Sequence, residues 1–438
     1  MNPGADVSVS LWALLAAACA GVALLVSGGL PLRFTRPSVL VGAMAIAMVT
    51  FGSWSYYATT QFFPHFHAPI DRALVFAAVG LGAAALGVRL TRVLPAREPR
   101  AVRWSWTPAP LDLAIWILLA LCVVGTLASI ARIGYIPILR GDIREERLYY
   151  AAQAGPFFRM SLLGTSAAIL GGVRWLAFGR SSLAALSVPL GLLCTSLYGP
   201  RFFPFVALGV LFICYDSFVR RVTPRNLAIG LGIVVALGIG GAIRRERAGT
   251  FVFDRPGVSI DARTAALAVG YVSVPEFRDF AWSLDYFADP ARRLHGRTLG
   301  GAIVPLLPGR VWSLVGVDKE ALYSRDSATL MAEILQVDTG IRIGIMGELY
   351  MNFGLAGIAV GMLLFGLFVG WLDRRLGAAS LLDPLVPLYA LVTLVSVFAL
   401  IGILNMFASS VVLFGWPLLL AAFLGARPVS APAAEPAA

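Results

Sequence analysis

Long apolar runs follow one another along most of the chain, separated by short polar segments. A transmembrane helix needs about 20 mainly apolar residues, and runs of about that length recur through the sequence. The predicted spans are residues 9–28, 38–58, 73–91, 110–131, 157–178, 181–198, 201–219, 226–243, 342–371, 384–402 and 405–425. The pattern therefore predicts an all-α integral membrane protein, a polytopic bundle of about 11 transmembrane helices.

The apolar pattern stops between residues 244 and 341, and this gap sets the domain organisation. Residues 1–243 hold helices 1–8 with a shorter loop at about 132–156, and residues 342–426 hold helices 9–11. A loop as long as 244–341 is usually functional or disordered. Its aromatic, amphipathic pieces, such as residues 276–287, favour a folded segment. The Pro- and Ala-rich tail 427–438 is typical of a disordered segment.

Composition agrees with a membrane protein. Only 13% of the 438 residues are charged, whereas soluble proteins average about 25%. The four cysteines, Cys19, Cys122, Cys194 and Cys214, all fall inside predicted helices, where they serve as small apolar residues. No positively charged segment precedes the first helix, so no cleavable signal peptide is expected.

The arginines orient the predicted helices. Short loops rich in arginine stay in the cytoplasm, and the most basic short segment, residues 89–109, holds five arginines. If that segment is cytoplasmic, alternation places the other short basic loops on the same side, with Arg33, Arg36, Arg174, Arg180, Arg220, Arg221, Arg225, Arg374, Arg375 and the C-terminal Arg427. Segments 59–72, 132–156 and 244–341 are then external.

The external segments are themselves rich in arginine, which suits an anionic substrate. Arginine forks match the oxygens of phosphate groups. The candidates for binding a lipid-linked diphosphate are Arg140, Arg144, Arg201, Arg244 and Arg310. The chain has a single lysine, Lys319, so arginine is its default cation. Pairing with carboxylates or lipid headgroups is therefore the alternative role for any one of them.

Three residues are candidates for a general base. Glu276 stands beside loop aromatics, Glu348 lies about two turns into a predicted helix, and His295 lies in the long loop. A structural, interfacial role for Glu348 is equally compatible with its position. The predicted spans are poor in charge, which disfavours an ion-coupled transporter. No Walker, HExxH or GxSxG motif occurs, and the segment with His65 and His67 is interpreted as interfacial rather than metal-binding.

Two stretches resemble the Wzy-type O-antigen (oligosaccharide repeat-unit) polymerases. Residues 295–312, HGRTLGGAIVPLLPGRVW, are similar to the family's glycine followed by Pro–Arg–Trp in its large periplasmic loop. Residues 344–357, GIMGELYMNFGLAG, are similar to its Glu-x-Tyr-x-Asn-Phe-Gly segment. Looser similarities are Tyr198-Gly-Pro-Arg201 and the spacing of Arg144 and Gly155. The resemblance covers roughly the C-terminal two thirds of the chain.

The resemblance implies a metal-independent glycosyltransferase with no cofactor in a bacterial inner membrane. Such enzymes transfer a growing glycan from undecaprenyl diphosphate to the next lipid-linked repeat unit at the periplasmic face, in O-antigen or exopolysaccharide synthesis. Arginines would neutralise the diphosphate leaving group, and one base would deprotonate the acceptor hydroxyl. The implied partners are the lipid-linked oligosaccharide, membrane lipids, a chain-length regulator and a flippase, with no nucleic acid.

Other functions remain open at this point. An O-antigen ligase uses the same donor and gives the chain to the lipid A core. A lipid-linked oligosaccharide flippase, or another transporter, belongs to a different class and predicts a charged central cavity with short external loops. A membrane scaffold would need no converging arginines.

Overall fold

The computed structural model describes residues 10–29, 32–62, 68–94, 102–139, 154–198, 202–223, 225, 274–304, 309–318, 327–335, 341–402 and 404–430. Within them, six helices are long and apolar enough to cross a membrane: Pro37–Gln61, Ile70–Val93, Pro108–Ile133, Pro156–Phe178, Gly344–Ala378 and Leu404–Gly425. Shorter apolar helices span Leu11–Ser27, Ser182–Ser196, Phe202–Phe218 and Val386–Ala399. The chain is thus a multi-pass, mainly α-helical membrane protein. The predicted span 226–243 lies outside the described residues, so the count of eleven is not confirmed.

The chain divides into two compact units, which are described separately. Unit 1 comprises Met1–Arg97, Asp261–Ala378 and Val392–Val412, and unit 2 comprises Glu98–Ile260, Ala379–Leu391 and Leu413–Ala438. The last two membrane helices, α18 (Val386–Ala399) and α19 (Leu404–Gly425), contribute residues to both units.

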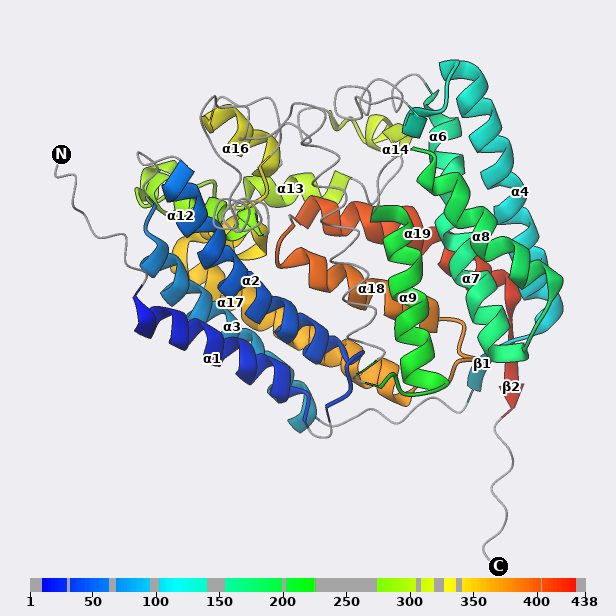
Figure 1. The fold of residues 1–438 in the computed structure, drawn as a ribbon, viewed down its shortest axis with the longest axis horizontal. Coiled ribbons are helices and arrows are strands. Elements are labelled where there is room, and N and C mark those ends of the chain that lie inside the picture. The colour runs from blue at the N-terminus through cyan, green and yellow to red at the C-terminus, as the bar shows by residue number, and fades with distance from the viewer. Residues whose placement is uncertain are drawn as a thin grey trace, which may run out of the picture. The chain divides into compact units, whose positions relative to one another are not determined.

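Unit 1 is built on four helices: α1 (Leu11–Ser27), α2 (Pro37–Phe62), α3 (Ile70–Val93) and the long α17 (Gly344–Ala378). Figure 1 shows α1, α2 and α3 in blue beside α17 in orange. Glycines let α3 and α17 approach closely, because a Cβ on Gly366 would collide with the carbonyl oxygen of Ala84 and one on Gly87 with that of Leu363. This is the packing of small residues that membrane helices use in place of a hydrophobic driving force.

Short helices complete unit 1. They are α12 (Pro275–Tyr286), the 3-10 turn η3 (Pro290–Arg292), α13 (Arg297–Ile303), α14 (Gly309–Leu314) and α16 (Ser327–Leu335). The amphipathic segment expected at residues 276–287 is confirmed as α12, which packs against α2, α3 and α17. Its apolar face buries Phe277, Phe280, Leu284 and Phe287. The part of the long loop between 274 and 304 is therefore folded onto the ends of the bundle helices.

The predicted basic loops of unit 1 meet at one end of its bundle. The Asp373 carboxylate near the end of α17 accepts a hydrogen bond of 3.1 Å from the backbone N–H of Ser38 in the first turn of α2. Arg374 donates to the carbonyl oxygen of Leu94, just after α3, at 2.6 Å. Three segments predicted to be cytoplasmic are thus in contact, as a shared membrane side requires.

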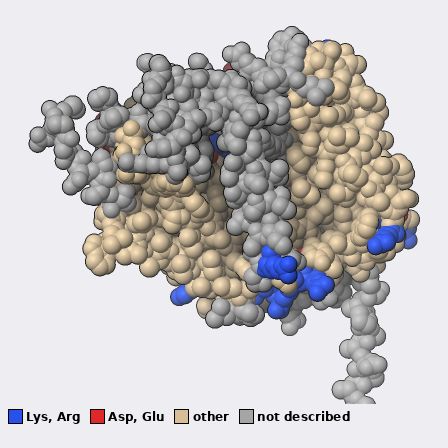
Figure 2. All heavy atoms as spheres, in the orientation of Figure 1, with Lys and Arg blue, Asp and Glu red and all other residues tan. Residues whose placement is uncertain are grey.

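Unit 2 contains α4 (Pro108–Ile133), the 3-10 turn η1 (Pro137–Leu139), α6 (Pro156–Ser161), α7 (Leu163–Phe178), α8 (Ser182–Ser196) and α9 (Phe202–Phe218). Two short strands, β1 (Val102–Trp106) and β2 (Ala426–Ser430), pair antiparallel. The expectation of a disordered tail from Arg427 is therefore wrong for residues 427–430. Backbone pairing with β1 orders them, although this Pro- and Ala-rich stretch lacks apolar alternation. The described surface in Figure 2 is largely uncharged, as lipid-facing helices require.

Candidate functional site in unit 1

Helix α17 is interrupted within its apolar run. Gly354 has φ 66° and ψ −155°, which is not a helical conformation. A break at this point leaves the carbonyl groups of the preceding turn without their partners four residues later in the helix. In a membrane, such groups must find other donors or line a polar cavity. The interruption therefore marks a place where another segment or a ligand must approach α17.

The segment after η3 supplies the missing donors. The N–H groups of Leu294 and His295 donate to the carbonyl oxygens of Met351 and Asn352, at 3.0 and 3.2 Å. The N–H of Gly296 donates to Oδ1 of Asn352 at 2.8 Å. The loop therefore satisfies the broken end of α17, and Asn352 is the residue that joins the two.

Asn352 is fully buried and uses both ends of its amide. Its Nδ2 donates to Oγ1 of Thr298 at 2.6 Å and to the carbonyl oxygen of Glu348 at 2.8 Å. Because a buried amide that loses one partner destabilises the fold, this network fixes the loop relative to the helix. Residues 295–312 and 344–357 thus contact each other directly, the first stretch through Gly296 and Thr298 and the second through Asn352.

The loop turns sharply at His295 and Gly296. His295 has φ 47° and Gly296 has φ 89°. A non-glycine residue in this region costs about 1–3 kcal/mol and persists only where its surroundings enforce it. Here the enforcement comes from the hydrogen bonds to Asn352. The side chain of His295 is exposed, so the strained turn holds an imidazole at the surface beside the broken helix.

Arg293 was not singled out by the sequence and stands at the interruption of α17. A Cβ on Gly354 would lie 2.9 Å from its Cζ, so the guanidinium rests against the Gly354 backbone. Its Nε is buried without a hydrogen-bond partner, and it forms no ion pair within the described part of the chain. The second half of α17 begins at this point, and the first N–H groups of a helix carry a partial positive charge. Arg293 and this helix start together form an anion-attracting corner.

The neighbouring Arg292 has a different environment. Its Nε lies 3.8 Å from a carboxylate oxygen of Asp289, and its guanidinium lies 5.0 Å from the centre of the Tyr286 ring. More than half of its side chain is exposed. Arg292 is therefore a paired surface arginine, while Arg293 is held against the broken helix. The partners of Arg292 are close to it in sequence, whereas Arg293 is held by a tertiary contact with Gly354 that no local pattern shows.

Glu348 is placed beside the network but away from any surface. Only 1% of it is exposed, and its Oε2 accepts a hydrogen bond of 2.8 Å from the backbone N–H of Leu404. Leu404 begins α19, so the carboxylate caps that helix. This environment favours the structural role over the role of a base that must reach a substrate hydroxyl.

Glu276 lies in the first turn of α12 and is 6% exposed. Its Oε1 pairs with Nη2 of Arg342 at 3.0 Å. Burial raises the pKa of Glu276, and the Arg342 guanidinium partly opposes this rise. Burial also raises the pKa of the nearby Asp279, which pairs with Arg278 at 2.8 Å. These residues form a second polar cluster, which we call the α12 cluster.

The structure does not bring all the predicted site residues together. Arg140, Arg144, Arg201 and Arg244 lie outside the described residues. Arg310 belongs to α14, but its side chain is likewise not described. Nearby, Nε1 of Trp312 donates to the carbonyl oxygen of Val304 at 3.0 Å, which ties α14 to the end of α13. His295 and Glu348 both lie along the network centred on Asn352, whereas Glu276 belongs to the α12 cluster.

Comparison of the chain with models of protein families, with curated proteins and with solved structures finds no match. The functional argument therefore rests on the residues and their geometry.

Proposed function

We propose that the protein is a membrane glycan polymerase that joins undecaprenyl-diphosphate-linked oligosaccharide repeat units at the periplasmic face of a bacterial inner membrane. One observation carries the proposal. The two family-like stretches lie more than 50 residues apart in sequence, and Asn352 joins them through hydrogen bonds to Gly296 and Thr298, with separations of 56 and 54 residues. Contact between these stretches is what a shared site requires.

In this proposal the lipid diphosphate binds at the corner formed by Arg293 and the start of the second half of α17. A diphosphate leaving group gains negative charge as the glycosidic bond breaks. The Arg293 guanidinium pairs with no carboxylate among the described residues and lies next to a helix start, so it supplies fixed positive charge where that charge develops. Arg310 stays a further candidate for the same role, since α14 follows the loop that carries Arg293.

His295 is the base that this geometry favours. Its imidazole is exposed and lies two residues from Arg293, whereas Glu348 is buried under α19 and Glu276 is paired with Arg342. The base accepts the proton of the acceptor sugar hydroxyl as the new glycosidic oxygen attacks the anomeric carbon. The donor's diphosphate leaves with the electron pair of the broken bond, so the step needs no oxidant and no nucleotide.

The test is to delete the gene and complement the strain with the wild type or with His295→Gln. A polymerase predicts lipid that carries a single repeat unit, with no ladder of longer chains, in the deletion strain and in His295→Gln. Long chains that remain on undecaprenyl diphosphate would instead indicate a ligase. Repeat units that stay on the cytoplasmic side would indicate a flippase. A normal ladder in the deletion strain would refute all three functions.

A further inference from the structure

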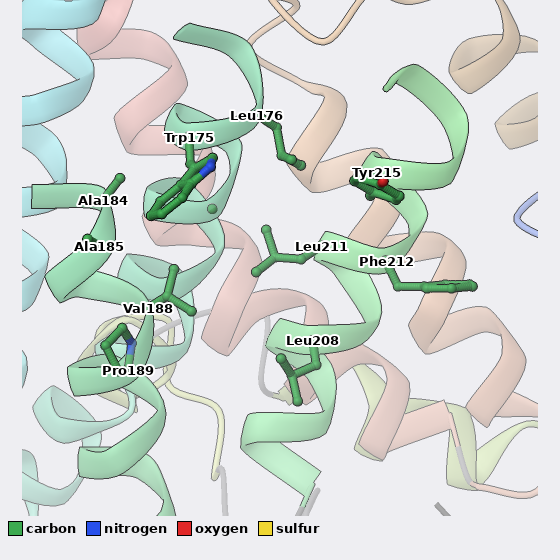
Figure 3. A pocket seen from close by; sticks show the side chains of 11 residues that line it. Trp175, Leu176, Ala184, Ala185, Val188, Pro189, Leu208, Leu211, Phe212 and Tyr215 are labelled. Atoms are coloured by element: carbon green, nitrogen blue, oxygen red, sulfur yellow. The ribbon is translucent and has the colours of Figure 1, made fainter. Parts of the chain in front are cut away.

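Unit 2 contains an apolar groove that the proposed function does not use. It has a volume of about 510 Å³ and is lined by residues of three helices: Gly172, Trp175, Leu176, Ala184, Ala185, Val188, Pro189, Leu208, Leu211, Phe212 and Tyr215. Helix α7 forms its floor, and α8 and α9 form its walls. In Figure 3, Leu211 points from α9 across the groove toward Val188 and Trp175. The volume lies within the range of about 300–1,000 Å³ that small-molecule sites occupy.

The groove is open along its side rather than sealed in the core. Trp175 is 39% exposed and Leu208 is 53% exposed, although both line it. The floor belongs to the span Pro156–Phe178, which is apolar enough to cross a membrane. An exposed apolar surface at this position faces lipid rather than water. The hydrocarbon chains of membrane lipids can therefore enter the groove.

Basic residues stand at one end of the groove. Its lining residues fall mainly in the second half of α7 and of α9 and in the first half of α8, so the groove lies toward the connection between α7 and α8 and the segment that follows α9. Those connections carry Arg180, between α7 and α8, and Arg220, after α9. Tyr215 precedes Arg220 by five residues, and α9 ends between them at Phe218.

These two arginines are available to a ligand. Both are exposed, and neither forms an ion pair among the residues that the structure describes. Arg174, in the same region, is different, because its Nε pairs with the Asp112 carboxylate at 2.9 Å and its guanidinium lies 5.2 Å from the centre of the Phe178 ring. The nearest acid of α9, Asp216, is buried and accepts from the N–H of Val222 at 2.6 Å. The end of the groove therefore presents net positive charge.

We infer that the groove binds one acyl chain of an anionic phospholipid, with the lipid phosphate held by Arg180 and Arg220. Apolar walls, an opening to lipid and a basic end together match a molecule that has a hydrocarbon tail and an anionic head. The arginine pattern assigns the short basic loops to the cytoplasmic side, so the occupant belongs to the cytoplasmic leaflet. This inference does not depend on the proposed function.

Trp175 provides a direct probe. The protein is reconstituted in phosphatidylcholine vesicles that contain increasing fractions of brominated-chain phosphatidylglycerol, or of brominated-chain phosphatidylcholine for comparison. The signal is the bromine quenching of wild-type fluorescence minus that of Trp175→Phe, which isolates this one tryptophan. Selective binding predicts half-maximal quenching at a mole fraction of the anionic lipid roughly 25-fold lower than for the neutral lipid, since each of the two basic residues near a membrane surface contributes about a factor of five.

Two variants test the two halves of the site. Ala185→Phe should fill the groove and abolish the anionic preference, whereas Leu186→Phe, on the neighbouring exposed position of α8, should leave it intact. Arg180→Ala combined with Arg220→Ala should make the two brominated lipids equally effective. Equal quenching by both lipids in the wild-type protein would overturn the inference, and so would a complete lack of Trp175 quenching, which would mean that protein covers the groove.

Discussion

At the residue scale, two adjacent arginines have very different surroundings. Arg292 is exposed and paired with Asp289, and Arg293 rests against the interrupted helix with a buried, unpartnered Nε. A surface ion pair contributes about 0–1 kcal/mol, so Arg292 is a dispensable residue. A guanidinium nitrogen that is buried without a partner costs desolvation free energy, and among the described residues no carboxylate pairs with Arg293 to offset that cost. That cost is explained if an anionic substrate completes the site.

Arg293→Ala should therefore abolish long glycan chains. Losing a charge-assisted contact to a leaving group should cost on the order of 2–4 kcal/mol in the transition state, or about two to three decades in rate. Arg293→Lys should restore activity only in part, because lysine keeps the charge but loses the fork. Arg292→Ala is the matched control. Chain-length profiles at equal protein abundance are the measurement, and a normal ladder from Arg293→Ala would remove Arg293 from the site.

Glu276 gives a prediction about pH. Burial raises its pKa above the ordinary value of 4.5, so the folded state holds the proton more tightly than the unfolded state. Its contribution to stability is complete below pH 4.5 and is lost as pH rises through the folded-state pKa. Glu276→Gln cannot titrate, so its stability relative to wild type should increase across that window.

The measurement is thermal unfolding in detergent at a series of pH values from 4 upward. Glu333→Gln, on the exposed side of α16, is the control and should follow the wild-type curve. A constant difference between wild type and Glu276→Gln across the series would contradict the prediction. Burial also raises the pKa of Asp279. Any pH dependence that remains in Glu276→Gln is therefore tested by adding Asp279→Asn to that variant.

At the element scale, the interruption of α17 is the feature that organises the site. The sequence predicted one continuous helix from about residue 342, because the apolar run passes through Gly354 without a break. Glycine in such a run also serves close helix packing, as Gly366 does. Only the backbone angles distinguish the two uses, and they depend on the loop at residues 294–298. A local pattern could not contain that information, whereas the helices on either side were predictable from hydropathy alone.

Gly354→Ala tests the interruption. The conformation with φ 66° and ψ −155° is essentially restricted to glycine. We expect a loss of about 1–3 kcal/mol in stability, together with displacement of the Arg293 guanidinium that a Cβ would meet at 2.9 Å. Gly377→Ala, near the end of the same helix, meets no atom within 4 Å and should be neutral or slightly stabilising. Melting temperature and chain-length profile are measured for both, and equal behaviour of the two variants would refute this account.

At the scale of the whole molecule, the basic loops set a testable orientation. Within unit 1, hydrogen bonds join segments that the arginine pattern assigns to one side. They link Ser38 to Asp373 and Arg374 to Leu94. Within unit 2, the pairing of β1 with β2 joins the basic segment 89–109 to the C-terminal strand, which the same pattern also places together. The alternation of membrane helices along the sequence predicts that these segments share one membrane side, because that prediction needs only the order of the helices. The strands themselves were not predictable, because five residues in a basic segment carry too little pattern.

The orientation can be measured with a reporter enzyme that is active only in the periplasm. Fused at Ala291, in the turn η3 that precedes Arg293, the reporter should be active. Fused at Ala96, within the most basic short segment of the sequence, it should be inactive. A cytoplasmic reporter should give the opposite pair of results. Activity of the periplasmic reporter at Ala96 would reverse the orientation and place the Arg293 corner on the wrong side for periplasmic chemistry.

The two-stranded sheet also sets an order of events during synthesis. Strand β1 leaves the ribosome long before β2, its pairing partner, because Trp106 pairs with Ala426 and Val102 with Ser430. At about 5–20 residues per second, the roughly 300 intervening residues take about 15–60 s to make. For that time the edge of β1 that later pairs with β2 is also unpaired, and such an edge can recruit other strands. The nascent protein therefore exposes this second edge until β2 arrives, and any chain that stops short of Ala426 keeps both edges of β1 unpaired.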